Sequence, residues 1–78
     1  MPSSAHLRVD AVVTRLVANG RRQDALVLLQ VRARDARVAG HNRDAAHLHS
    51  LRASLFLAAG HDSSALRELR TAVRLDPL

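Results

Sequence analysis

The sequence predicts an all-α protein of four helices that fold as two antiparallel hairpins. The first observation is a set of three glycines at a fixed spacing of 20 residues: Gly20, Gly40 and Gly60. Glycine ends a helix readily, because it adopts the left-handed backbone conformation without a steric penalty. The second observation is that each glycine is followed five residues later by an alanine, which opens a stretch of apolar residues at helical spacing. A fixed period of this kind is typical of a repeat architecture.

Composition agrees with one small helical domain over residues 1–78, with hairpins at about 4–38 and 42–76. The chain is 47% hydrophobic but has a single aromatic residue, Phe56, so its core must consist of Leu, Val and Ala. The absence of cysteine excludes disulfides and thiol chemistry. There is no apolar run of about 18 residues and no signal-peptide pattern at the N-terminus. We therefore expect a cytoplasmic protein with no membrane partner.

The first helix is predicted near residues 4–18. Its apolar residues recur at helical spacing: Val9, Val12, Val13 and Leu16. Because valine is common in strands, a strand over Leu7–Val17 is the alternative.

The second helix is predicted near residues 22–38 and is apolar on two sides. Its main face consists of Ala25, Leu26, Leu29, Ala33 and Ala36. The opposite stripe consists of Val27, Val31 and Val38. A helix that is apolar on two sides normally lies between neighbours, so we expect this stripe, together with Phe56, to serve as a packing or oligomer surface.

The third helix is predicted near residues 42–59, with Asn42 as its capping residue. Two apolar faces flank a narrow polar strip of His47, Ser50 and Ser54.

The fourth helix is predicted near residues 62–75 and begins with a cap at Asp62 or Ser63. Its expected core residues are Ala65, Leu66, Leu69, Ala72 and Val73, and its expected outer face carries Arg67, Arg70 and Arg74. Pro77 ends the helix, because proline disfavours the helical conformation of the residue before it.

The second half of the chain resembles a tetratricopeptide repeat. The matching residues are Ala53, Phe56, Gly60, Ala65, Leu69, Ala72 and the closing pair Asp76-Pro77. In that family, small residues let the two helices of a hairpin approach closely, and the proline turns the chain toward the next repeat. The first hairpin matches through fewer residues and has Arg37 where the closing proline would stand.

This resemblance implies a binding groove lined by the first helix of each hairpin. By position, the groove residues are Leu7, Asp10, Thr14, Val17, His47, Ser50, Ser54 and Leu57. Small polar and apolar residues there suit an amphipathic helix or an extended peptide of a partner protein. In size the chain is also similar to the small tetratricopeptide-type chaperones of bacterial type III secretion.

No residue pattern points to catalysis, a cofactor or a metal. His47 and His49 are two positions apart, so on a helix they point in different directions and do not converge on one ion. The single glutamate, Glu68, is expected on the exposed side of the last helix, and no nucleophile has an adjacent base.

These observations predict a non-catalytic protein-binding module, an adaptor or small chaperone, that forms a homodimer or one half of an obligate heteromer. The formal charge of +5 keeps a nucleic-acid-binding protein as an alternative, although the chain lacks aromatic residues for base stacking. A structural self-assembly module is the third alternative.

Overall fold

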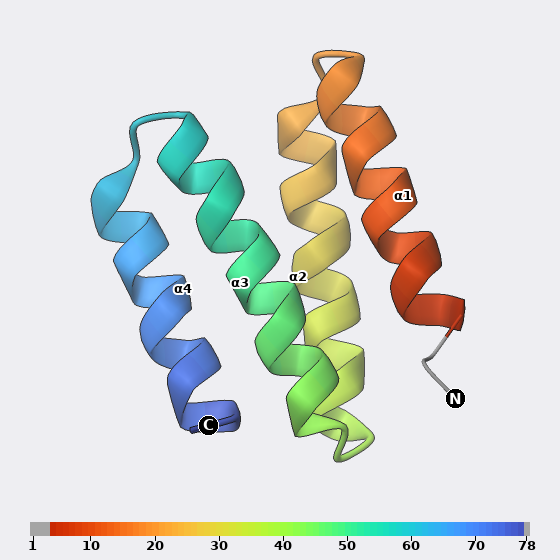
Figure 1. The fold of residues 1–78 in the computed structure, drawn as a ribbon, viewed down its shortest axis with the longest axis vertical. Coiled ribbons are helices and arrows are strands. Elements are labelled where there is room, and N and C mark those ends of the chain that lie inside the picture. The colour runs from red at the N-terminus through yellow and green to blue at the C-terminus, as the bar shows by residue number, and fades with distance from the viewer. Residues whose placement is uncertain (1–3, 78) are drawn as a thin grey trace.

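The computed structural model describes the backbone of residues 4–77 and the side chains of residues 8–77. All regular structure in this part of the chain is helical (Figure 1). The helices are α1 (Ser4–Ala18), α2 (Arg22–Val38), α3 (Asn42–Ala58) and α4 (Asp62–Leu75). The predicted all-α fold is confirmed, with the end of α3 one residue earlier than predicted. The alternative strand over Leu7–Val17 is wrong, because this segment lies within α1.

Consecutive helices run antiparallel and lie side by side in the order of the sequence (Figure 1). The main packing contacts join α1 to α2, α2 to α3, and α3 to α4. The resulting body is a flat slab of 31 × 27 × 18 Å. The closest neighbour of α1 is α2 and that of α4 is α3, and α1 also contacts α3 through the core.

The three connections are three-residue turns with the same hydrogen-bond pattern. In the first, the Gly20 amide donates to the Val17 carbonyl at 3.0 Å, and the Arg21 amide donates to the Leu16 carbonyl at 2.8 Å. These two bonds define the Schellman motif, which satisfies carbonyls at a helix end. The motif requires a left-handed residue, and the φ angles of the three glycines are +75°, +79° and +79°.

The residue after each glycine is also the N-cap of the next helix. These residues are Arg21, His41 and His61, and none makes a side-chain capping bond. The predicted caps are therefore wrong, because Asn42 and Asp62 are already the first helical residues and Ser63 is the second residue of α4. The turn is too short for a separate capping residue. The residue whose amide completes the Schellman motif is therefore also the N-cap of the following helix.

The main core lies among α1, α2 and α3. Its buried members are Val9, Val13, Ala25, Leu29, Ala33 and Leu48. Leucine and valine side chains from the same three helices pack around this cluster, as the composition predicts. Burial of such side chains away from water is the main favourable term in folding.

The α3–α4 interface is instead built on alanines. Ala53 of α3 and Ala65 and Ala72 of α4 are all buried, which lets the two helices approach closely. The prediction that Leu66, Leu69 and Val73 face the core is wrong, since these side chains are exposed. The buried side of α4 is centred on the alanines, and no helix within the described part of the chain covers the neighbouring stripe.

Replacing Gly40 with alanine should lower the free energy of unfolding by about 1 kcal/mol, because the left-handed conformation costs an L-residue about 1–2 kcal/mol. Contacts with the rest of the protein add nothing, since no heavy atom beyond the two chain neighbours lies within 4 Å of the added Cβ. Urea denaturation followed by circular dichroism measures the change. Gly40→Asn is the control and should lose less, because asparagine tolerates the left-handed region. Equal stability of Gly40→Ala and the wild type would contradict the observed turn.

Candidate functional site

The predicted groove residues lie on α1 and α3, and one pair of them is in direct contact. The Asp10 carboxylate Oδ1 lies 3.2 Å from His47 Nε2, which joins α1 to α3. Both side chains keep more than a third of their surface exposed. The residues predicted for one surface are thus brought together at this point, and we call this surface the α1–α3 face.

Two hydroxyl groups of the α1–α3 face, those of Thr14 and Ser54, donate within their own helices. Thr14 donates to the Asp10 carbonyl at 2.9 Å, and Ser54 donates to the Ser50 carbonyl at 3.2 Å. Such bonds to the carbonyl four residues earlier are local and leave the oxygen lone pairs available as acceptors. The exposed part of this face therefore offers mainly hydrogen-bond acceptors.

The remaining groove residues differ in accessibility. Val17 packs against the main core, Ser50 is half-buried, and Leu57 is exposed. The side chain of Leu7 lies outside the described residues.

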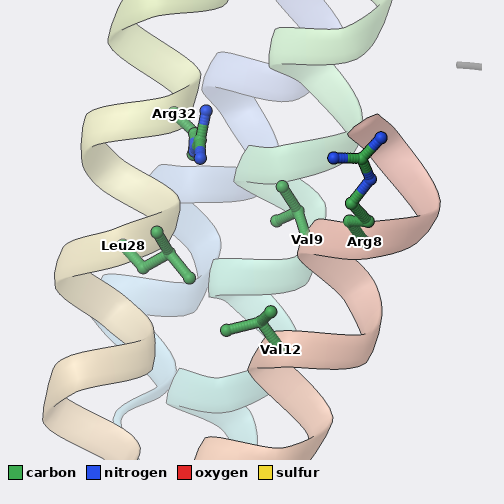
Figure 2. A pocket seen from close by; sticks show the side chains of 5 residues that line it. All are labelled: Arg8, Val9, Val12, Leu28 and Arg32. Carbon is green, nitrogen blue, oxygen red and sulfur yellow. The ribbon is translucent and has the colours of Figure 1, made fainter. Parts of the chain in front are cut away.

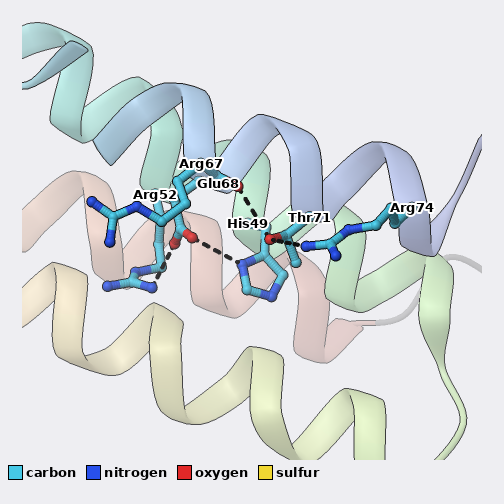
Figure 3. A network of polar contacts seen from close by, with 6 residues as sticks. All are labelled: His49, Arg52, Arg67, Glu68, Thr71 and Arg74. Carbon is cyan, nitrogen blue, oxygen red and sulfur yellow. Dashed lines mark hydrogen bonds and ion pairs between the residues drawn. The ribbon is translucent and has the colours of Figure 1, made fainter. Parts of the chain in front are cut away.

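A buried ionic cluster, which sequence reasoning missed, lies between α3 and α4 (Figure 3). Arg52 Nη1 donates to Glu68 Oε1 at 2.5 Å, and His49 Nδ1 lies 3.5 Å from Glu68 Oε2. The side chains of these three residues are only 11–16% exposed. The prediction that Glu68 sits on the exposed side of its helix is therefore wrong. We call these residues the α3–α4 cluster.

An aromatic chain extends the α3–α4 cluster toward the Gly60 turn. The Arg52 guanidinium carbon lies 5.5 Å from the centre of the Phe56 ring, within the range of a cation–π contact. The Phe56 ring meets His61 edge-on, with centroids 6.4 Å apart. Phe56, predicted as part of an oligomer surface, is half-buried and makes these contacts inside its own chain.

The α3–α4 cluster is incompletely satisfied. Neither ring nitrogen of His49 makes a hydrogen bond, and neither does Arg52 Nε. A buried polar group without a partner costs about 1–3 kcal/mol. The cost of these unsatisfied nitrogens therefore offsets the stabilisation that the Arg52–Glu68 hydrogen bond gives. Breaking one member of such a pair is nevertheless strongly unfavourable, because the other charge is then buried alone.

The internal repeat offers the signal that could have revealed this cluster. Gly20 and Gly60 mark equivalent turns, so positions 40 residues apart are equivalent in the two hairpins. The equivalents of His49, Arg52 and Glu68 are Val9, Val12 and Leu28, all apolar. Three positions that are apolar in the first hairpin are thus polar in the second. Such a joint difference indicates that the three polar side chains of the second hairpin contact one another.

At the same place in the first hairpin the structure has a hollow (Figure 2). Its lining residues come from α1 and α2: Arg8, Val9, Val12, Leu28 and Arg32. The volume is about 290 Å³. Arg32 stands where the second hairpin has the small Ala72, so these two helices cannot approach as α3 and α4 do.

The valines predicted as a packing surface on α2 are exposed. Val27 and Val31 are about half exposed, and Val38 is the most exposed of the large apolar residues on the described part of the chain. Val38 lies beside a shallow depression that it lines with Arg34 and Arg37.

No three histidine, aspartate or glutamate side chains among residues 8–77 are grouped so that they could hold a metal ion. Among the described helices, none has the length and apolar character needed to cross a bilayer. Compared with known proteins, the chain matches no family model, no curated protein and no solved structure. The tetratricopeptide resemblance stays a prediction.

Glu68→Leu should lower the free energy of unfolding by about 3 kcal/mol, because it leaves the Arg52 guanidinium largely buried without its carboxylate. The triple variant His49→Val/Arg52→Val/Glu68→Leu copies the equivalent residues of the first hairpin. It should return to within about 1 kcal/mol of the wild type, since an apolar replacement removes every unpaired polar group. Urea denaturation of the three proteins tests this. A triple variant as unstable as the single one would show that the cluster itself stabilises the fold.

Proposed function

We propose that the chain is a non-catalytic protein-binding module, an adaptor or small chaperone that binds a helix or peptide of a partner protein. The observation that carries the proposal is the amount of apolar surface left in water. Eight large apolar side chains on residues 8–77 are at least 41% exposed: Val12, Val27, Val31, Val38, Leu57, Leu66, Leu69 and Val73. Single exposed apolar residues are ordinary, but grouped ones are typical of interaction surfaces.

The architecture supports the same proposal. The packing of consecutive helices is consistent with the tetratricopeptide-like hairpins that the sequence predicts, and stacked hairpins typically present extended binding surfaces. The α1–α3 face, with its acceptor oxygens and the exposed Leu57, remains the proposed groove for a peptide. A partner bound to the α1–α3 face or to the exposed apolar side chains would make the chain one half of a heteromer.

Nucleic-acid binding is the alternative that the twelve arginines raise, and salt dependence separates the two functions. A protein that neutralises several phosphates loses about 10³–10⁵ in affinity between roughly 50 and 200 mM salt. The affinity of a surface that binds through apolar side chains changes little over that range of salt concentration.

We expect the tagged chain, crosslinked in lysate of its own source, to capture one dominant protein with equal yield at low and moderate salt. The yield is measured by quantitative mass spectrometry, and the double variant Val27→Ser/Leu69→Ser should reduce it, since it removes apolar contacts from two helices. The control is Arg15→Gln/Arg22→Gln/Arg34→Gln, three exposed arginines of α1 and α2, which should leave most of the yield. Tight binding of generic DNA or RNA with a steep salt slope, and no captured protein, would overturn the proposal.

A further inference from the structure

We infer that α4 carries a docking site for one amphipathic helix of a partner protein, seated on α4 as α3 is seated on α2, with acidic residues beside its apolar stripe. This inference rests on the proposed function, to which it adds the location of the site and the chemistry of the partner.

The internal repeat identifies the site. Leu66, Leu69 and Val73 stand 40 residues after Leu26, Leu29 and Ala33. The three residues of α2 are 7%, 0% and 1% exposed, whereas their equivalents on α4 are 49%, 41% and 62% exposed. The positions that are buried on α2 are therefore exposed to solvent on α4. We call Leu66, Leu69 and Val73 the α4 stripe.

The contacts of α3 with α2 show which kind of helix would pack on the α4 stripe. Leu48 of α3 is buried in one cluster with Leu29 and Ala33 of α2, and Leu51 and Leu55 pack against that cluster. These three leucines are spaced i, i+3 and i+7, which places them along one side of a helix. A helix with apolar residues at this spacing fits an equivalent seat on α4.

The seat extends onto α3. Leu57 stands 40 residues after Val17, which packs against the main core, yet Leu57 is exposed. The partner helix would therefore contact both helices of the second hairpin.

A second copy of the chain does not fit this seat. Continuing the stack would bring α1 of the next copy onto α4, and α1 has Arg8, Ala11 and Arg15 at the positions equivalent to Leu48, Leu51 and Leu55. All three residues are exposed, and two of them are arginines, so this side of α1 lacks the leucines that would fill the seat. Pairing of α4 with α4 of another copy would bring like-charged arginines together.

Charge determines the chemistry of the partner. Arg67, Arg70 and Arg74 are exposed on the flank next to the α4 stripe, and Arg74 Nη2 donates to Thr71 Oγ1 at 3.3 Å (Figure 3). The acidic residues of α4 are Asp62, in its first turn, and Glu68, in the buried α3–α4 cluster. Glu68 stands between Arg67 and Arg70 in the sequence but is buried, so the exposed row of arginines favours a partner with carboxylates on the facing flank.

The probes are three synthetic 17-residue peptides of the length of α3. The first has leucines at the spacing of Leu48, Leu51 and Leu55 and glutamates on the flank that would face the arginines. The second has lysines in place of the glutamates, and the third has serines in place of the leucines. Fluorescence anisotropy measures binding of each labelled peptide to the full chain and to two variants, Leu69→Ser and the control Val31→Ser. Val31 is a large apolar residue of α2 that is 51% exposed, against 41% for Leu69.

The glutamate peptide should bind the wild type and Val31→Ser with equal affinity, and Leu69→Ser at least about tenfold more weakly. The lysine and serine peptides should also bind the wild type at least about tenfold more weakly. Equal binding by the two variants, equal binding of the glutamate and lysine peptides, or no binding of the glutamate peptide would overturn the inference. So would a dimer in sedimentation velocity that Leu69→Ser dissociates, because the stripe would then be a contact between copies.

The crosslinking capture described above distinguishes failure of this inference from failure of the proposed function. A partner captured equally by the wild type and by Leu69→Ser alone would refute the α4 site while leaving a protein-binding function on another surface. The absence of any captured protein would refute the function itself.

Discussion

A left-handed glycine at every twentieth residue sets the geometry of the whole chain. Each three-residue turn closes one helix with two hydrogen bonds and begins the next helix at its last residue. Because the turns are so short, consecutive helices must lie side by side and antiparallel. The contacts between them then recur at a fixed register, which is why the buried alanines Ala25, Ala45 and Ala65 follow the glycines at the same interval. The antiparallel order of the helices follows from this spacing, whereas the packing within each hairpin depends on its side chains.

The helices could be predicted from the sequence almost to the residue, because glycine turns and helical periodicity are local signals. The buried side of α4 could not. Leucine and valine are expected inside, but Leu69 and Val73 need a helix to cover them, and α4 has a close neighbour on one side only. Periodicity ranks residues by hydrophobicity and does not reveal how many neighbours a helix has.

The candidate site was predicted in part for a related reason. The Asp10–His47 contact joins two residues that the tetratricopeptide resemblance assigns to one groove. The burial of Glu68 escaped prediction, because a lone glutamate on an amphipathic helix is ordinarily exposed. Its partners, His49 and Arg52, lie on another helix, and only a comparison of the two hairpins position by position brings the three together.

The two hairpins pack their helices through different side chains. The second closes around small alanines and a polar cluster, whereas the first keeps apolar residues and stays open beside Arg32. A buried ionic group contributes little net stability, but it disfavours alternative pairings in which it would lie unpaired. In a chain whose helices share one register, such a group distinguishes the α3–α4 pair from the other helix pairs.

The sequential packing of the slab also bears on how the chain folds. Every main helix contact joins segments that are neighbours along the chain, so no long loop must close before favourable contacts form. Low contact order of this kind is typical of helical proteins that fold in microseconds to milliseconds. A nascent chain can thus pack each helix against the one before it, and the main core is complete once Leu48 of α3 joins α1 and α2.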